Sequence, residues 1–346
     1  MTSTSVAEVS PARATDILAS PAQDRHNVQI WDFTLAPEAS EHLVAQASQS
    51  PSPYCDFMHY AIVCRKLVAL LPDPLLLLLS LFRTYAKAPG AMIMRGLPID
   101  VPLPPTPSDG GRANKTTFVT EAMLGMIAHI FGEPYSYASE KKGEIVQNIV
   151  PVPSKEHMRS NEGSLSDFLL HTENAFFDFR PDYLLLFGLR AGGSLAATTV
   201  VYARDALALL DDVTIRTLSR PLFRISAPES FRAGHDRQVW SPPTPVILGD
   251  RDMPESRLNF NGITALTSTA VKALDALQAA CSRVMVKICL QPGEMLVIDN
   301  RKALHGRTPF APGFGPEARW LQRAYVRSNL WAGRTFVACR PNLISG

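Results

Sequence analysis

Short apolar runs separated by turns constrain the fold of this chain more than any other feature of its sequence. Eight such runs follow residue 144, at residues 145–150, 168–172, 183–189, 196–202, 223–226, 246–248, 284–290 and 295–298. Many short strands with turns between them favour a sandwich or jelly roll. Pro292 and Gly293, which separate the last two runs, suit the centre of a type II turn, so we expect those runs to form a hairpin.

Helical segments surround this β core. Apolar periodicity predicts helices near residues 41–48, 57–71, 75–86, 120–131, 206–218 and 268–282, and a strand at 91–97. We therefore expect a mainly β fold with helical additions: a double-stranded β-helix (jelly roll, cupin-like) core flanked by helices.

The domain boundaries follow from the same patterns. No internal repeat or linker divides the chain, so we expect a single domain over residues 26–346, mainly helical at 26–135 and with a jelly-roll core and helical inserts at 140–340. Residues 1–25, rich in Ser, Thr, Ala and Pro, are typical of a disordered tail. The segment near 227–245, rich in Pro and charged residues, is either a lid or an ordinary surface loop.

Composition limits the partners of the chain. The formal net charge is +2 and there is no basic run, so the sequence has no electrostatic footprint for nucleic acid or an anionic membrane. The leucine-rich run at residues 75–82 is far shorter than the roughly 20 apolar residues of a spanning helix and predicts a buried helix instead. We expect a small-molecule partner. Five cysteines without metal-ligand spacing, and an N-terminus unlike a signal peptide, favour a cytoplasmic location.

The motif His171-Thr172-Glu173 provides the first chemical signal. It follows an apolar run that reads as a strand, so His171 and Glu173 project from the same side and can converge on one ion. His305 follows a second apolar strand and a polar turn. Two imidazoles and one carboxylate that leave other coordination positions open suit non-haem Fe(II).

These elements, with Arg319 fourteen residues after His305, together resemble the clavaminate synthase-like group of Fe(II)/2-oxoglutarate-dependent oxygenases. Members of that group include hydroxylases of free arginine, asparagine and lysine. The resemblance spans roughly residues 91–330 and includes the phrases Gly132-Glu133-Pro134, Gln147-Asn148-Ile149-Val150-Pro151, Phe179-Arg180-Pro181-Asp182-Tyr183 and Val246-Ile247-Leu248-Gly249.

The resemblance implies roles for particular residues. His171, Glu173 and His305 would be the iron ligands. Arg319 matches the arginine that grips the distal carboxylate of 2-oxoglutarate, a task that suits the planar guanidinium fork. Thr199, or its neighbour Thr198, matches a hydroxyl donor to the same carboxylate.

The resemblance also implies a binding site for the α-carboxylate of a free amino acid. Arg323, four residues after Arg319, matches the second arginine of that group and is the expected ligand, with Arg327 as the second candidate. Residues 320–327 alternate like a strand, so Arg319, Arg323 and Arg327 can share one face. Gln147, and Ser164 in the loop at residues 161–164, resemble positions that hold the substrate's amine or carboxylate.

The side-chain pocket departs from that of the arginine-hydroxylating relatives. Where those enzymes place two acids, this chain has Asn259 and Asn261, and an amide pair suits a neutral ureido or carboxamide group better than a cation. This favours citrulline, ahead of asparagine or glutamine, as the substrate. Asp250 and Asp252 support the alternative, in which the pocket takes arginine or lysine.

The implied reaction is hydroxylation of C3 or C4 of the amino acid, with O2 and 2-oxoglutarate as co-substrates and succinate and CO2 as products, in natural-product (antibiotic) biosynthesis. Glu173 fills the position that a halogenase leaves open for halide, which argues against halogenation. Desaturation or epoxidation stays open. A zinc hydrolase and a non-enzymatic jelly-roll binding protein are the alternatives of other classes.

Overall fold

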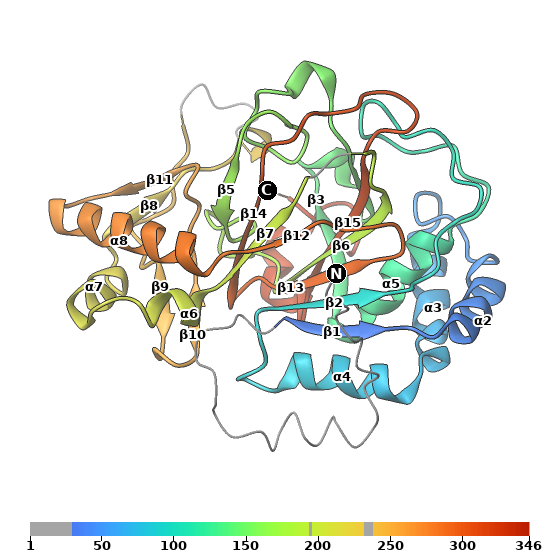
Figure 1. The fold of residues 1–346 in the computed structure, drawn as a ribbon, viewed down its shortest axis with the longest axis horizontal. Helices are drawn as coiled ribbons and strands as arrows, with labels where there is room; N and C mark the ends of the chain where they lie inside the picture. Colours follow the sequence, from blue (N-terminus) through green and yellow to red (C-terminus); the bar gives the residue numbers. More distant parts are fainter. Residues whose placement is uncertain (1–29, 194–195, 232–237, 346) are drawn as a thin grey trace, which may run out of the picture.

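Two β-sheets lie at the centre of the molecule, with helices on both sides (Figure 1). The computed structural model describes residues 30–193, 196–231 and 238–345. The larger sheet has eight strands in the order β1-β2-β13-β6-β15-β3-β16, with β4 pairing with β15. Its strands are β1 (Trp31–Thr34), β2 (Ala91–Arg95), β3 (Glu133–Tyr137), β4 (Gln147–Ile149), β6 (Tyr183–Arg190), β13 (Met295–Asp299), β15 (Trp320–Arg327) and β16 (Leu343–Ile344).

The smaller sheet has four antiparallel strands in the order β12-β7-β14-β5. They are β5 (Phe168–His171), β7 (Thr198–Tyr202), β12 (Val286–Ile288) and β14 (Ala303–Arg307). Val200 and Ala303 on its inner face pack in one apolar cluster with Leu296, Leu321 and Tyr325 of the larger sheet. The two sheets therefore form a sandwich with a shared apolar interior.

The outer face of the larger sheet is covered by α2 (Pro37–Ala47), α3 (Phe57–Leu67), α4 (Asp73–Thr84) and α5 (Val119–Phe131). The leucine-rich run forms α4, whose Leu75, Leu78, Leu79 and Phe82 are buried, so the predicted core helix is confirmed. None of the helices in residues 30–193, 196–231 and 238–345 is long and apolar enough to cross a membrane.

The second helical group packs on the outer face of the smaller sheet. It comprises α6 (Ala203–Leu207), α7 (Asp212–Leu218) and α8 (Ser268–Val284), which lie together at the opposite end of the view in Figure 1 from α2 to α5. Two short two-stranded sheets accompany them, β8 (Phe223–Ile225) with β11 (Ile263–Ala265) and β9 (Ile247–Gly249) with β10 (Pro254–Ser256).

The β core with helices on both sides confirms the expected fold class at that level, but the predicted hairpin is wrong. The strands on either side of Pro292-Gly293 belong to different sheets: β12 pairs with β7, whereas β13 pairs with β2 and β6. Gly293 has φ +81°, as a turn requires, and that turn carries the chain from one sheet to the other. The predicted tail at residues 1–25 lies outside the described residues, as do residues 232–237 of the predicted lid.

Candidate active site

Two histidines face each other across the smaller sheet. His171 ends β5 and is the direct cross-strand partner of His305 in β14, with ring centroids 4.3 Å apart. Gly306, next to His305, permits this close strand approach, because a Cβ there would lie 2.5 Å from the Phe168 carbonyl oxygen. The sequence thus brings two imidazoles that are distant in the chain to one point.

Glu173 joins the two histidines from the turn after β5. Asn300 holds its backbone from both sides: Glu173 N donates to Asn300 Oδ1 at 2.7 Å, and Asn300 Nδ2 donates to the Glu173 carbonyl oxygen at 3.2 Å. Glu173 Oε2 lies 3.4 Å from His305 Nε2, and one ligand atom from each of His171, Glu173 and His305 lies within 4.8 Å of the others. The structure therefore brings the three predicted ligands together.

The protonation states of these residues suit a metal ion. Burial and the neighbouring His305 lower the pKa of His171 to about 3, so its imidazole is neutral. The Leu169 carbonyl oxygen accepts a hydrogen bond from His171 Nδ1 at 2.9 Å. Burial alone would raise the pKa of Glu173, but Arg323 and the two imidazoles outweigh it and hold the pKa below its usual value. Glu173 Oε2 is buried without a hydrogen-bond partner among the described residues. A divalent cation would supply that partner, so the site fits the Fe(II) expected there.

Two buried arginines lie beside this triad: Arg319 has no matching carboxylate among the described residues, whereas Asp167 lies near Arg307. Arg319 directly precedes β15 and makes no hydrogen bond or ion pair with another described residue; its guanidinium lies 5.6 Å from the Phe310 ring centroid. Burial and the nearby Arg307 lower the pKa of Arg319 to about 10, and burial lowers that of Arg307 to about 10. Both line a cavity of about 40 Å³ that His305 also lines. An anion bound there would relieve the cost of the uncompensated Arg319 cation.

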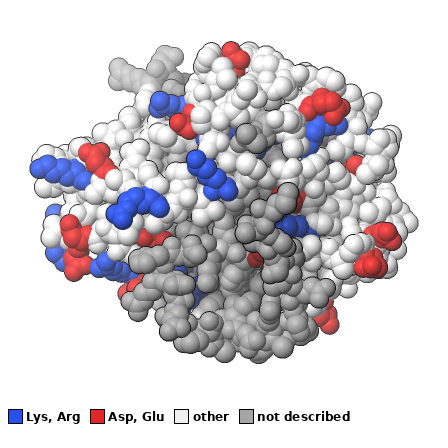
Figure 2. All heavy atoms as spheres, viewed as in Figure 1, with Lys and Arg blue, Asp and Glu red and all other residues white. Residues whose placement is uncertain are grey.

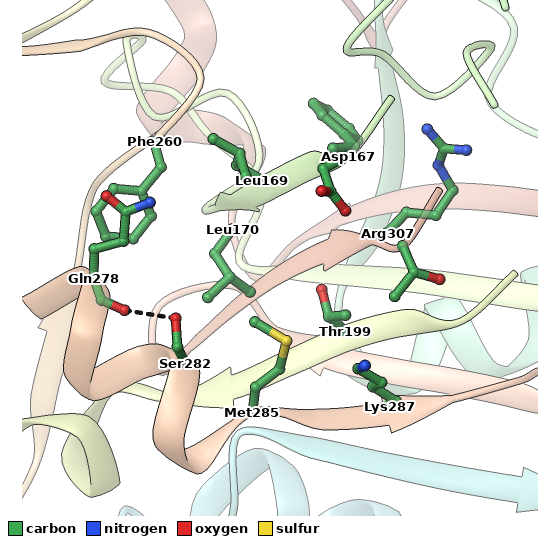
Figure 3. Close-up of a pocket in the computed structure, with 12 residues that line it drawn as sticks. Asp167, Leu169, Leu170, Thr199, Phe260, Gln278, Ser282, Met285, Lys287 and Arg307 are labelled. Atoms are coloured by element: carbon green, nitrogen blue, oxygen red, sulfur yellow. Dashed lines mark hydrogen bonds between the residues drawn. The ribbon is translucent and has the colours of Figure 1, made fainter. Parts of the chain in front are cut away.

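The two adjacent threonines of β7 point to opposite faces of the smaller sheet. Thr198 lines the inner cavity with Arg319. Thr199, the residue expected to contact 2-oxoglutarate, lines instead a cavity of about 190 Å³ between the outer face of the sheet and α8 (Figure 3). Because side chains alternate along a strand, Thr198 is the one that lies on the Arg319 side.

Arg323 of β15 is held from several directions. Gln147 Oε1 accepts from Arg323 Nε at 3.0 Å and from Arg323 Nη2 at 2.5 Å. Gln147 therefore binds the Arg323 guanidinium through two hydrogen bonds. Arg323 Nη2 also lies 3.3 Å from Glu140 Oε2. Arg323 Nη1 is buried without a hydrogen-bond partner among the described residues and lies 3.6 Å from Glu173 Oε2. One donor of this fork therefore remains available next to the triad.

Ser164 lies on the Arg307 side of the site. Its carbonyl oxygen accepts from Arg307 Nη1 at 3.3 Å and from Phe310 N at 2.9 Å. Its hydroxyl oxygen is buried and has no hydrogen-bond partner within the part of the chain that the structure describes. Arg327 lies apart from this group, with its guanidinium over the Phe179 ring.

The structure does not bring the four predicted side-chain-pocket residues into the cavity. Asn261 accepts from Leu169 N at 3.2 Å and donates to Leu169 O at 3.2 Å, while Asn259 Oδ1 accepts from Asn261 Nδ2 at 3.0 Å. These amides therefore fasten their segment to β5. Asp250 and Asp252 are exposed in the turn between β9 and β10, where Asp252 N donates to Asp250 Oδ1 at 2.8 Å.

The described ends of the predicted lid approach an aromatic group near the site. Ser226 forms a β-bridge with Trp240, and Ala227 N donates to Val239 O at 2.9 Å. The Phe231 ring lies 5.1 Å from that of Tyr137, which belongs to the inner apolar cluster.

Sequence reasoning missed Glu140, Tyr325, Arg307 and Asn300. Strand alternation could have found Tyr325, because it lies two residues beyond Arg323 on the same face. Strand alternation could also have found Arg307, because it lies two residues after His305 and therefore on the same face of the strand. Glu140 and Asn300 lie outside regular strands, so periodicity gives no signal for them.

Comparison with known proteins gives consistent results. Residues 90–325 match the model of the taurine catabolism dioxygenase TauD, TfdA family. L-asparagine oxygenase of Streptomyces coelicolor is 36% identical over 327 residues, covering 93% of this chain and 95% of that protein. L-lysine 3-hydroxylase of Catenulispora acidiphila is 33% identical over 244 residues (68% and 67%). Clavaminate synthase 2 of Streptomyces clavuligerus is 30% identical over 293 residues (84% and 90%).

Solved structures agree with these relatives. Asparagine oxygenase in complex with Fe(II), 2S,3S-3-hydroxyasparagine and succinate matches with a TM-score of 0.82 and 34% identity, covering 91% of this chain and 99% of that one. The non-haem iron oxygenase OrfP with Fe, succinate and (3R,4R)-dihydroxy-L-Arg matches with a TM-score of 0.81 and 28% identity, with the same coverage.

Proposed function

The chain belongs to the taurine catabolism dioxygenase TauD, TfdA family, and from that premise we propose that it hydroxylates C3 of a free L-amino acid whose side chain ends in a neutral amide. It is a non-haem iron dioxygenase of the amino acid hydroxylase group, with Fe(II) and 2-oxoglutarate as cofactor and co-substrate. Within the proposal, His171, Glu173 and His305 hold the iron. Fe(II) with 2-oxoglutarate and O2 supplies the oxidising power for an unactivated C–H bond, and the protein supplies orientation and water exclusion.

The 2-oxoglutarate site is assigned to the cavity that Arg319 and Arg307 line. Arg319, buried and lacking a counter-charge among the described residues, would take the distal carboxylate, with Thr198 as the hydroxyl donor in place of Thr199. Arg307 adds positive charge to the same cavity. This arrangement also disfavours a zinc hydrolase, because such an enzyme binds no 2-oxoglutarate and Arg319 would then have no carboxylate to bind.

The observation that carries the substrate assignment is the position of Arg323. Its unpartnered Nη1 lies 3.6 Å from the iron ligand Glu173, so an α-carboxylate bound there would keep the first carbons of the substrate near the metal. C3 lies two bonds from the carboxyl carbon, whereas the end of a long side chain lies far beyond. Of the two positions expected from the sequence, we therefore favour C3.

The side chain is proposed to end in a neutral amide, with the carboxamide of asparagine ahead of the ureido group of citrulline. The amide of Asn261 binds Leu169 of β5 and that of Asn259 accepts from Asn261, so neither supports citrulline, and none of the relatives described above is named for citrulline. Glu173 is the only carboxylate among the described residues that line the cavity, and Glu140 lies beyond it on Arg323, so the cavity wall itself offers a cationic side chain no free counter-charge. Arginine or lysine is the second candidate, because L-lysine 3-hydroxylase is 33% identical.

The strand order supports the jelly-roll interpretation of the core. The segments β13-β6-β15-β4 and β12-β7-β14-β5 form two facing antiparallel sheets, the arrangement of a double-stranded β-helix. The relation of clavaminate synthase 2 to this chain supports a role in natural-product biosynthesis.

Competitive turnover tests this function. L-Asparagine, L-citrulline, L-arginine, L-lysine and L-aspartate are mixed in equal amounts with enzyme, Fe(II), 2-oxoglutarate and O2, and products are separated by mass and by fragmentation. We expect 3-hydroxyasparagine to dominate. Dominant hydroxyarginine or hydroxylysine would contradict the neutral side chain, and loss of two hydrogens in place of oxygen gain would indicate desaturation. A product formed without O2 would indicate hydrolysis.

A further inference from the structure

A second cavity, which the reaction above does not use, lies between the outer face of the smaller sheet and α8 (Figure 3). We call it the outer cavity, and the cavity beside Arg319 the inner cavity. The outer cavity has a volume of about 190 Å³, far more than the roughly 15 Å³ that one small molecule such as water requires. Its apolar lining consists of Phe168, Leu169, Leu170, Phe260 and Met285. Leu170 and Met285 point toward each other across it (Figure 3).

The two cavities meet at a β-bulge. His171 of β5 pairs with His305 of β14, and the next pair is Phe168 with Arg307, so β5 has one more residue than β14 between these pairs. Such a bulge interrupts the ladder and changes the direction of a side chain. Phe168 and Arg307 both line the outer and the inner cavity. The cavities therefore share a wall at the bulge.

This wall is thin and lies directly beside the metal site. Gly306 lines the inner cavity and Thr199 the outer one, and a Cβ on Gly306 would lie only 2.9 Å from Thr199 Oγ1. The Phe168 ring packs against the imidazole of His171, with ring centroids 4.2 Å apart. A small molecule that passed Phe168 would therefore arrive next to a proposed iron ligand.

Phe168 is the part of the wall that can move most easily. Arg307 is fixed, because its Nη1 donates to the Ser164 carbonyl oxygen at 3.3 Å and its Nη2 to the Ser166 carbonyl oxygen at 3.0 Å. Phe168 is half-buried, and rotation of its ring breaks no hydrogen bond. Side-chain rotation is also much faster than a typical catalytic turnover.

The surroundings of the outer cavity suit a small neutral molecule. The charged residues that line it, Asp167, Lys287 and Arg307, are of both signs. Over α7 and α8, at the left of Figure 2, Lys and Arg lie among Asp and Glu, so the visible face has no patch of one sign there. Among the reactants proposed above, only O2 is small, neutral and apolar.

The inner cavity offers O2 little room once the other reactants are bound. Arg319 and Arg323, to which the carboxylates of 2-oxoglutarate and of the amino acid are assigned, both line it. These two ligands would therefore occupy it from their own side. The wall at Phe168 would stay accessible from the opposite face of the smaller sheet.

We propose that O2 collects in the outer cavity and reaches the iron past Phe168, on a path separate from that of the amino acid and 2-oxoglutarate. This rests on the iron site of the proposed function. The path lets O2 enter after the other two reactants have closed the inner cavity. It also keeps the polar reactants away from the apolar route.

Filling the outer cavity tests this path. Met285→Trp places a larger ring across it, and Ala279→Trp, at an exposed position of α8 that does not line the cavity, is the matched control. Succinate formation is measured at several O2 concentrations with the amino acid that has the highest turnover in the competitive panel. We expect Met285→Trp to lower kcat/KM for O2 by about threefold or more, a barrier change of roughly 0.7 kcal/mol. The KM values for 2-oxoglutarate and the amino acid should stay unchanged, as should all three constants in Ala279→Trp.

Xenon gives a second measurement that needs no turnover, because this apolar atom occupies apolar cavities. Wild-type crystals under xenon pressure should show xenon between Leu170 and Met285, and Met285→Trp crystals should not. Absence of xenon from the wild-type cavity would overturn the proposal. So would an unchanged kcat/KM for O2 in Met285→Trp, or a rise in the other two KM values that accompanies its loss. Absence of amino-acid-dependent succinate from the wild-type enzyme is a different result, and it would overturn the proposed function itself.

Discussion

Gly306 of β14 packs so closely against Phe168 of β5 that a Cβ at position 306 would lie 2.5 Å from the Phe168 carbonyl oxygen. This contact sets the separation of the two strands that carry His171 and His305. The spacing of two proposed iron ligands therefore depends on the absence of a side chain at a neighbouring position.

The Gly306→Ala variant is predicted to force β5 and β14 apart. We expect a loss of roughly 1–3 kcal/mol in the free energy of unfolding, typical of overpacking, and weaker Fe(II) binding by about tenfold or more. Urea denaturation and anaerobic metal titration check both. Gly313→Ala is the control, since a Cβ there would meet its nearest atom at 3.6 Å. Wild-type metal affinity in Gly306→Ala would contradict the prediction.

The threonine pair of β7 provides a matched test of the 2-oxoglutarate site. Thr198→Val removes a hydroxyl from the Arg319 cavity, so the KM for 2-oxoglutarate should rise about three- to tenfold, the effect of one neutral hydrogen bond. Thr199→Val changes the cavity under α8 and should leave that KM unchanged. Steady-state succinate formation measures both. The reverse pattern would restore the assignment made from the sequence.

A buried ion cluster links α5 to the strand that carries Arg323. Lys115 pairs with both Asp100 and Glu121. Asp100 accepts from Val119 N and so caps α5, and Glu121 accepts from Gln322 of β15 at 2.8 Å. Lys115→Met would leave two buried carboxylates without their cation, so we expect the free energy of unfolding to fall by about 3–5 kcal/mol. Exposed Lys87→Met is the control for the urea measurement. A loss below about 1 kcal/mol would show that the carboxylates find other partners.

His129 of α5 should make stability depend on pH. Both ring nitrogens are buried without hydrogen-bond partners in the described part of the chain, and burial, then Arg65, lowers the pKa of His129 from 6.5 to about 4. The unfolded chain therefore takes up this proton first as the pH falls. Stability is complete above pH 6.5 and declines toward pH 4, by on the order of 3 kcal/mol.

The His129→Gln variant isolates this contribution. With both proteins in the same metal state, the acid-induced loss between pH 7 and 4 should be smaller in the variant. Parallel pH profiles for the two proteins would show that His129 has the same pKa in the folded and unfolded states, which would contradict the prediction.

Strand alternation correctly predicted that Arg323 faces inward, because residues 320–327 form one continuous strand and side chains alternate with a period of two. Its role in binding a substrate stays a prediction. The same rule failed to choose between Thr198 and Thr199. That choice depends on the register between β7 and β14, where His305 pairs with Val200, and such long-range pairing is not encoded locally.

The remaining differences have physical causes of the same kind. Pro292 and Gly293 specify a turn but not whether the next strand returns to the same sheet, and here it enters the other one. Asn259 lies next to His171, yet the Asn261 amide binds the backbone of β5 and the Asn259 amide accepts from Asn261, so neither faces the cavity. Side-chain amides compete for backbone groups in ways that spacing does not reveal.

The most direct test of the central claim is isotope incorporation from ¹⁸O2. L-Asparagine is incubated with the enzyme, Fe(II), 2-oxoglutarate and ¹⁸O2, and the amino acid and succinate are quantified by mass spectrometry. The account predicts one labelled hydroxyl on C3 of the amino acid for each succinate formed, and no product when O2 is excluded. Succinate released without any oxygen transfer to an amino acid would contradict it.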